Sequence, residues 1–246
     1  MASALQLAAR GLYTTTPNPR VGSVVVSQGA VVGSGWHQIA GEAHAEILAL
    51  QEAGTAARGA TLYVTLEPCS HHGRTPPCVD AVIASGIARV VAAMQDPNPL
   101  VAGQGLARLE AAGIETAVGL YEDQARALNI GFVARMTRGR PWLRLKIAAT
   151  IDGKTALANG VSKWITGPAA RRDVHRMRAR SCALLTGSGS VLADNPELTV
   201  RDTLTPRQPL RVVLDSQLRT PASARIAGPN TLLLSVVDNP ESRHAL

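Results

Sequence analysis

The sequence predicts an α/β protein made of two consecutive domains, and three observations lead to this prediction. Apolar residues make up 46% of the 246 residues but aromatic residues only 3%, so Val, Leu, Ile and Ala must build the core, as is common in α/β layers. Short apolar runs alternate with helix-like segments along the chain. Residues 138–141, which are charged and contain Gly and Pro, precede a new apolar run and form the best domain boundary.

The first domain, residues 1–139, is expected to be a three-layered α/β/α unit. An alanine- and leucine-rich helix over 2–10 ends at Gly11, and turn residues at 28–30 join two apolar runs into a hairpin. The expected elements are the two hairpin strands, 21–27 and 31–36, then a helix over 43–53 stopped at Gly54, a strand over 61–65, a helix over 78–85, a strand over 89–93, a helix over 105–112, a strand over 114–119 and a helix over 122–135.

The second domain, residues 140–246, repeats the α/β pattern. Its helix over 168–180 has Pro168 at the first position, where proline is favoured because the missing N–H would have no partner within the helix. Glycines 187 and 189 are interpreted as a turn at a strand end, since the full dinucleotide-binding fingerprint is missing. The expected strands are 142–149, 183–186, 211–214 and 231–236.

One combination of residues carries chemistry: His44, Cys69 and Cys78, together with Glu46. Catalytic zinc takes imidazole nitrogen and thiolate sulfur from three protein ligands and leaves a fourth position to water. Zinc lowers the pKa of that water to near 7, so a nearby carboxylate can take its proton. A His-x-Glu pair followed by Pro-Cys and a further Cys is the signature of zinc-dependent nucleobase deaminases, in which the Glu is general acid and base. The sequence therefore predicts hydrolytic deamination, with three zinc ligands and Glu46 as the proton shuttle.

Taken singly, these residues have ordinary structural explanations, because a histidine often caps a helix and free cysteine is often buried. Only the combination favours catalysis. Residues at i and i+2 of a helix do not share a face, so His44 must lie in an irregular first turn, and we place the helix start at about Ala43. Cys182 lies in an apolar run and is expected in the core.

The net charge of +7 and the pI near 10.0 come largely from arginine. Arginine binds nucleic acids, but it equally binds phosphorylated small molecules. No aromatic residues are interleaved with the arginines, which disfavours nucleic acid as the partner. The sequence has neither an apolar run of about 18 residues nor the start of a signal peptide, so we expect a cytoplasmic protein that does not bind membranes.

Residues 16–22, 41–46 and 66–78 together resemble the bifunctional deaminase/reductase family of riboflavin biosynthesis. The resemblance implies a cytidine-deaminase-like first domain that removes an amino group from a diaminopyrimidinone ribosyl phosphate, and it suggests self-association. Eight residues separate Cys69 from Cys78, where related nucleic-acid deaminases usually have two. By the same resemblance, the substrate is contacted by Asn18, His37, His71 and Arg74.

The second half resembles the family's reductase at residues 146–155, 162–166, 190–196, 198–201 and 213–216. This implies a dihydrofolate-reductase-like α/β domain with NADPH as hydride donor. The implied NADPH contacts are Ala148, Trp164, Ser190, Asp194 and Ser216. The implied substrate contacts are Ser162, Arg178, Leu198 and Arg201, with Lys146 a weaker candidate.

Compared with the family, the first helix is expected to lack a turn, and the reductase domain is expected to be C-terminally incomplete, without the family's glycine-rich Glu-x-Gly-Pro segment. We therefore expect a chain that deaminates but reduces poorly. Two alternatives remain open. A tRNA or single-stranded nucleic-acid deaminase is favoured by the basic pI, and a non-catalytic, metal-stabilised module would use Glu46 only as a carboxylate at a helix start.

Overall fold

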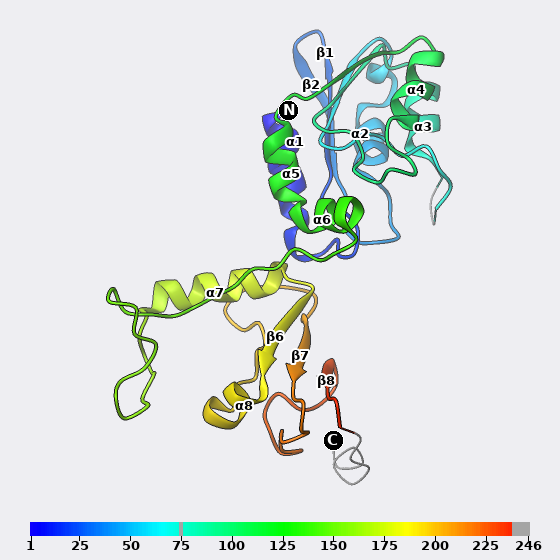
Figure 1. Ribbon diagram of the computed structural model, residues 1–246. Helices are drawn as coiled ribbons and strands as arrows, with labels where there is room; N and C mark the ends of the chain where they lie inside the picture. The colour runs from blue at the N-terminus through cyan, green and yellow to red at the C-terminus, as the bar shows by residue number, and fades with distance from the viewer. Residues whose placement is uncertain (74–75, 238–246) are drawn as a thin grey trace. The chain divides into compact units, whose positions relative to one another are not determined.

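The computed structural model describes residues 1–73 and 76–237 and divides into two compact units, Met1–Arg144 and Leu145–Leu246 (Figure 1). Each unit is built on its own sheet. The strand order is β2-β1-β3-β4-β5 in the first unit and β6-β7-β8 in the second. The mixed α/β class predicted from the sequence is confirmed in both units.

The first unit opens with α1 (Ala2–Ala9), which continues directly as a 3-10 turn, η1 (Arg10–Tyr13). The helix expected over 2–10 is confirmed to within one residue, but Gly11 does not stop the chain, because Arg10 keeps right-handed helical angles and leads into the 3-10 turn. The predicted hairpin is confirmed as antiparallel β1 (Gly22–Ser27) and β2 (Ala30–Trp36). Gln28 and Gly29 both have positive φ, as two-residue hairpin turns require.

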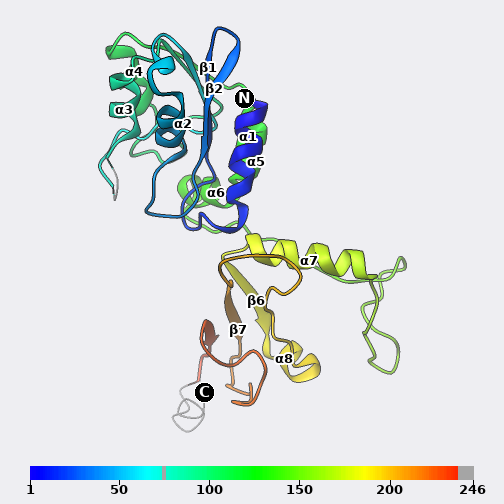
Figure 2. The same ribbon diagram turned by 180° about the vertical axis from the view of Figure 1, so that it is seen from behind.

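The remaining strands of this sheet are β3 (Thr61–Val64), which is antiparallel to β1, then β4 (Arg89–Ala92) and β5 (Glu115–Val118), which are parallel. Three helices cover one face: α2 (Ala45–Ala53), which continues as η2 (Gly54–Ala57), α3 (Cys78–Ala84) and α4 (Gln104–Ala111). Helices α1 and α5 lie on the opposite face (Figures 1 and 2). The predicted three-layered α/β/α arrangement is thereby confirmed.

Helix α2 lies directly on strand β2, and two glycines allow this contact. A Cβ atom on Gly33 would lie 2.2 Å from the carbonyl oxygen of Ala49, and one on Gly35 would lie 2.5 Å from that of Ala45. Any side chain at these positions would push the helix off the strand. The start of α2, where the chemistry is expected, is therefore fixed against the hairpin.

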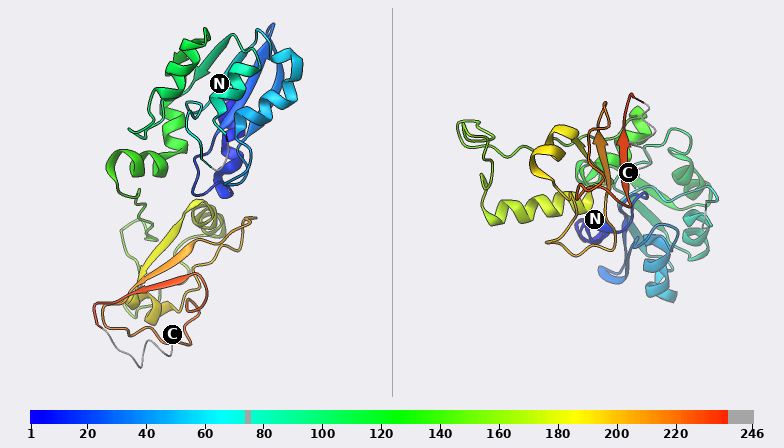
Figure 3. Two further views of the ribbon diagram at one scale, coloured as in Figure 1. Left: turned by 90° about the vertical axis from the view of Figure 1, so that its right-hand side faces the viewer. Right: turned by 90° about the horizontal axis from the view of Figure 1, so that it is seen from below.

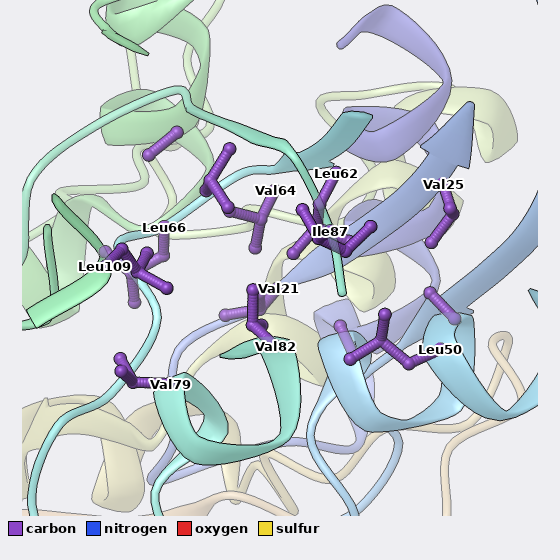
Figure 4. Close-up of a cluster of buried hydrophobic side chains, with 14 of the residues drawn as sticks. Val21, Val25, Leu50, Leu62, Val64, Leu66, Val79, Val82, Ile87 and Leu109 are labelled. Carbon is purple, nitrogen blue, oxygen red and sulfur yellow. The ribbon is translucent and has the colours of Figure 1, made fainter. Parts of the chain in front are cut away.

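The largest part of the core of this unit lies between the sheet and helices α2 to α4 (Figure 4), and Ala125 of α5 adds to it from the opposite face. Leu62 and Val64 of β3 are fully buried, as are Val79 and Val82 of α3 and Leu109 of α4. Fully burying a Val or Leu side chain contributes about 1.5–3 kcal/mol. This packing holds α3 and α4 firmly on the face of the sheet that they cover.

The single helix expected over 122–135 is wrong, because the chain forms α5 (Glu122–Leu128) and α6 (Ile130–Arg138) with a break at Asn129. The fully buried Asn129 side chain accepts the backbone N–H of Arg20 at 2.8 Å and donates to the carbonyl of Arg20 at 2.9 Å. A contact with a residue so far back in the chain leaves no local signal in the sequence.

In the second unit, β6 (Ala183–Gly187), β7 (Leu210–Leu214) and β8 (Thr231–Leu234) form a parallel sheet (Figure 3). Helix α7 (Pro168–Arg180) has the predicted bounds. Helix α8 (Ser188–Asp194) follows β6 directly, so the interpretation of glycines 187 and 189 as only a turn is wrong.

The two faces of this second sheet differ. Val213 of β7 packs with Val191, Ala224 and Ile226 in a buried cluster. The opposite face, which we call the leucine face, exposes side chains to between 41% and 60%. Its members are Leu185, Leu210, Leu214, Leu232 and Leu234.

Two further expectations for this half of the chain are wrong. Residues 142–149 are described but form no strand, and Leu143 and Leu145 are 79% and 85% exposed. Their apolar alternation would suit a strand, but this segment pairs with none of β6, β7 and β8. Cys182 is exposed rather than buried, because it precedes β6, which is an edge strand.

Within residues 1–73 and 76–237, no helix has the length and apolar character needed to cross a membrane.

Candidate active site

The structure brings His44, Cys69 and Cys78 together. His44 caps the start of α2, Cys69 lies in the loop after β3, and Cys78 is the first residue of α3. Their ligand atoms all lie within 4.8 Å of one another. The Nδ1 atom of His44 is 3.1 Å from Sγ of Cys78 and 3.6 Å from Sγ of Cys69. One imidazole nitrogen and two sulfurs form a donor set that suits zinc and leaves a fourth position for water.

Helix α2 begins at Ala45, two residues later than we expected from the sequence. His44 has extended backbone angles, φ −76° and ψ 163°, so it lies just outside the helix. Its side chain therefore does not follow the helical spacing that would separate it from Glu46. His44 and Glu46 can therefore face the same site although they are only two positions apart in the sequence.

Glu46 lies in the first turn of α2 and is only 3% exposed. Burial, together with the negative charge of the nearby Cys69 thiolate, raises the pKa of Glu46 to about 7. A carboxylate with such a pKa can take up a proton near neutral pH and release it again. General acid–base catalysis requires this behaviour.

The two cysteines differ in protonation. Hydrogen bonds from the Cys78 thiol and from His44 lower the pKa of Cys69 to about 4. The backbone N–H of Cys78 also donates to Sγ of Cys69 at 3.3 Å. The pKa of Cys78 is raised, because its thiol donates to Cys69 and is itself buried. Cys69 is therefore the more acidic of the two, and a metal that binds here displaces the proton of the Cys78 thiol and any proton on Nδ1 of His44.

Asn18 and His37 adjoin these ligands. The Nδ1 atom of His37 lies 3.1 Å from the carbonyl oxygen of Ala43, which can only accept, so Nδ1 carries the proton. The Nε2 atom then accepts from the amide nitrogen of Asn18 at 3.0 Å. Burial lowers the pKa of His37, which favours this neutral ring. The rings of His37 and His44 meet edge to face, with centroids 5.3 Å apart.

Of the other expected substrate contacts in this unit, His71 is exposed on the loop between the two cysteine ligands. Arg74 lies outside the described residues.

In the second unit, part of the expected NADPH set lies at one edge of the sheet. Ser190 is in the first turn of α8, which follows the carboxyl end of β6, and Ser216 follows the carboxyl end of β7, whereas Asp194 is the last residue of α8. Open α/β sheets bind ligands at this edge. Ala148 and Trp164 lie in segments without regular secondary structure, and the Arg171 guanidinium is 4.5 Å from the Trp164 ring centre.

Two of the expected substrate residues of this unit, Arg178 and Arg201, bond to the segment that contains a third, Leu198. Arg178 of α7 donates to the carbonyl oxygen of Thr199 at 3.0 Å, next to Leu198. Arg201 pairs with Glu197 at 2.7 Å. Ser162 and Lys146 lie in the irregular segment that precedes α7.

The roles of two buried polar residues near the expected site were not predicted from the sequence. Glu67 is 4% exposed and accepts backbone N–H groups from the start of α4, and Asn129 fixes the backbone of Arg20. An acidic residue directly before the Pro-Cys pair was a usable signal for Glu67. Asn129 had none, because its partner is distant in sequence.

Comparison with known proteins identifies the family. The profile described as "Cytidine and deoxycytidylate deaminase zinc-binding region" matches residues 1–94, and the "RibD C-terminal domain" matches residues 141–245. The riboflavin biosynthesis protein RibD of Aquifex aeolicus is 49% identical over 245 residues, which cover 100% of this chain and 69% of that protein. The chain belongs to the RibD family. RibD of Escherichia coli is 58% identical over 238 residues, or 92% of this chain and 65% of its own length.

Solved structures agree with this assignment. RibD of Acinetobacter baumannii, form 1, superposes with a TM-score of 0.93 at 47% identity, covering 99% of this chain and 70% of that one. A diaminohydroxyphosphoribosylaminopyrimidine deaminase/5-amino-6-(5-phosphoribosylamino)uracil reductase from Thermotoga maritima gives 0.91 at 41% identity, covering 98% and 71%. The family resemblance noted in the sequence motifs is therefore confirmed. The chain spans about two thirds of the length of these relatives.

Proposed function

We propose that this chain catalyses the zinc-dependent hydrolytic deamination of 2,5-diamino-6-(5-phosphoribosylamino)pyrimidin-4(3H)-one. The observation that carries the proposal is the convergence of His44, Cys69 and Cys78 beside the buried carboxyl of Glu46. Membership of the RibD family supports the choice of substrate. In this proposal residues 1–139 carry the deaminase and residues 140–246 the reductase.

The residues of the chain divide the reaction among them. When bound, zinc supplies a water molecule that is acidic enough to lose a proton near neutral pH. Glu46 takes this proton and delivers it to the departing amino group. Water thereby adds to the amino-bearing ring carbon, the C–N bond breaks and ammonia leaves. Asn18 and His37 orient the ring, while His71 and Arg74 on the loop between the cysteines hold the ribosyl phosphate.

The test is ammonia release from this substrate by the purified chain, with and without a strong zinc chelator. We expect release that the chelator abolishes and that added zinc restores. Glu46→Gln should retain zinc but lose activity by at least about a hundredfold, because the general base is removed. Glu52→Gln, at the exposed end of the same helix, is the matched control. A zinc-loaded, folded wild-type chain that releases no ammonia would refute the proposal.

The proposal includes a small phosphorylated pyrimidine, rather than nucleic acid, as the substrate. It also includes action in the cytoplasm and the self-association suggested by the family. A deaminase that acts on tRNA would instead bind RNA with a steep dependence on salt.

We further propose that the second unit binds NADPH. The supporting observation is that Ser190, in the first turn of α8, and Ser216 follow the carboxyl ends of β6 and β7, where nucleotides bind in α/β folds. NADPH fluorescence should change on titration with the chain, and Ser190→Trp should weaken binding by filling that edge. Ser223→Trp, in an exposed turn, is the control. Equal binding by the wild type and both variants would contradict the assignment.

A further inference from the structure

Helix α4 contributes no expected ligand, yet it bonds to both segments that carry cysteine ligands. We propose that α4 holds in place the two chain segments that carry the cysteine ligands. Glu67 and Arg108 act as positioning residues that set the affinity and geometry of the metal site. This inference rests on the proposed zinc site and concerns its support rather than the chemical step. It follows from contacts before Cys69, after Cys69 and beside Cys78.

The first contact is made by the carboxylate of Glu67, two residues before Cys69. Its Oε2 atom accepts the backbone N–H of Asp96 at 3.0 Å and that of Gly103 at 2.9 Å. Its Oε1 atom accepts the N–H of Gly105 at 2.8 Å and that of Leu106 at 3.3 Å. Four amides thus bind one carboxylate that is 4% exposed. The loop after β4 and the first turn of α4 are thereby tied to the Pro-Cys segment.

The second contact is made by backbone alone. A Cβ atom on Gly105 would lie 2.1 Å from the carbonyl oxygen of Pro68 and 3.1 Å from Oε1 of Glu67. The first turn of α4 therefore touches the peptide that immediately precedes Cys69. Only glycine permits this approach, so α4 restricts the backbone from which the ligand projects.

The third contact is the Arg108 guanidinium, which reaches both ligand segments from α4. Its Nη1 atom donates to the carbonyl oxygen of Ser70 at 3.0 Å, directly after Cys69. Its Nη2 atom pairs with Asp80, in the first turn of α3 and two residues after Cys78. One side chain thus links the segments of the two cysteines.

These contacts leave the cysteines little freedom to separate when no metal is bound. A site held ready in this way avoids the loss of conformational freedom that assembling the ligands would otherwise cost. Residues that support metal ligands typically change metal affinity or activity by about 10- to 100-fold when they are mutated. We therefore expect changes at Glu67 and Arg108 to appear in metal binding itself.

The first test variant is Glu67→Gln, which keeps one acceptor oxygen and replaces the other with an NH₂ group. That group cannot accept from the amides that face it. Zinc affinity, measured by competition with a chromophoric chelator, should fall by about 10- to 100-fold. The absorption bands of the Co²⁺-loaded protein, which report the geometry of thiolate coordination, should shift. Arg108→Ala, at a half-exposed position, should show a smaller change of the same kind.

The matched control is Val91→Ala, which shortens a buried side chain of β4 on the face of the sheet away from α4. It should lower the melting temperature but keep zinc affinity and the Co²⁺ spectrum close to those of the wild type. The proposal is overturned if Val91→Ala weakens zinc binding as much as Glu67→Gln, or if both test variants bind metal like the wild type. If the wild type does not bind zinc, both the zinc site and the supporting role of α4 are refuted. Zinc binding without deamination would refute only the proposed function, because the zinc affinities of the variants still report the support that α4 gives to the site.

Discussion

Glu46 and Cys69 show how one buried environment shifts the pKa values of two acidic groups in opposite directions. Burial raises the pKa of Glu46, because the carboxyl accepts too few hydrogen bonds to offset the loss of water. The thiolate of Cys69 is also removed from water, yet hydrogen bonds from Cys78 and His44 outweigh that cost and lower its pKa. A proton acceptor and a metal-ready thiolate therefore coexist near neutral pH.

His175 makes the stability of the second unit depend on pH. It is 7% exposed, and its Nδ1 atom accepts the backbone N–H of Arg201 at 3.2 Å, so the ring is neutral. Burial lowers its pKa, as do the charges of Arg178 and Arg201, while Asp202 opposes them. Below pH 6.5, the ordinary value, the unfolded chain binds the proton more readily than the folded one. The free energy of unfolding therefore decreases as the pH falls through this value.

We predict that the melting temperature drops between about pH 7.5 and about pH 5.5 more for the wild type than for His175→Gln, which cannot be protonated. Thermal denaturation followed by circular dichroism measures the difference. His71→Gln, at an exposed position, should keep the pH dependence of the wild type. An unchanged pH dependence in His175→Gln would contradict this account.

At the scale of elements, the break between α5 and α6 connects two distant segments. Asn129 holds Arg20, and the loop before Arg20 carries Asn18, which bonds His37 beside the candidate metal ligands. The helix pair therefore supports the expected substrate contact from the far end of the first unit's sequence.

Asn129→Ala should reduce the free energy of unfolding by about 2–4 kcal/mol, because two partly buried backbone groups of Arg20 lose their partner and a buried side chain is deleted. It should also raise the KM for deamination more than it lowers kcat, since the Asn18 loop is loosened. Urea denaturation and steady-state kinetics measure both effects. Asn159→Ala, on an exposed turn of the second unit, should change stability by less than about 0.5 kcal/mol. If Asn129→Ala is as stable as the wild type, the hydrogen bonds between Asn129 and Arg20 are not needed for stability.

Elements with local signals could be predicted from the sequence, and those defined by distant contacts could not. Helix α7 has Pro168 at its start, and the hairpin has turn residues at 28 and 29, so both were predicted correctly. The break at Asn129 depends on Arg20, a contact across 109 residues. The strand expected over 142–149 had the right alternation, but a strand also needs a partner, which a single segment does not reveal.

The candidate site follows the same rule. The zinc ligands were recognisable because residue type and spacing express the chemistry directly. The position of His44 outside α2 was not, since the exact start of a helix is weakly encoded. The contacts of Glu67 with residues 96–106 arise only when β4 and α4 are in place, so the sequence marks Glu67 by its position before the Pro-Cys pair but does not reveal its partners.

At the scale of the whole molecule, all three candidate zinc ligands belong to the unit Met1–Arg144. A ligand stabilises only the folded state that binds it, by about 4 kcal/mol at a thousandfold excess over Kd. Calorimetry should therefore resolve two unfolding transitions. A zinc chelator should lower the melting temperature of only one of them. The fragment 1–144 should retain the zinc-sensitive transition. A chelator that shifts both transitions equally would show that the two units unfold as one.

The leucine face of the second sheet has a consequence for the behaviour of the chain in solution. Five exposed leucines lie together on a molecule of net charge +7. In dilute salt, like charge keeps copies apart, whereas at about 0.15 M salt the Debye length shortens to about 8 Å and that repulsion weakens. Attraction between apolar surfaces is not screened in this way. Concentrated solutions of the chain should therefore stay clear at low ionic strength and turn cloudy as salt is added.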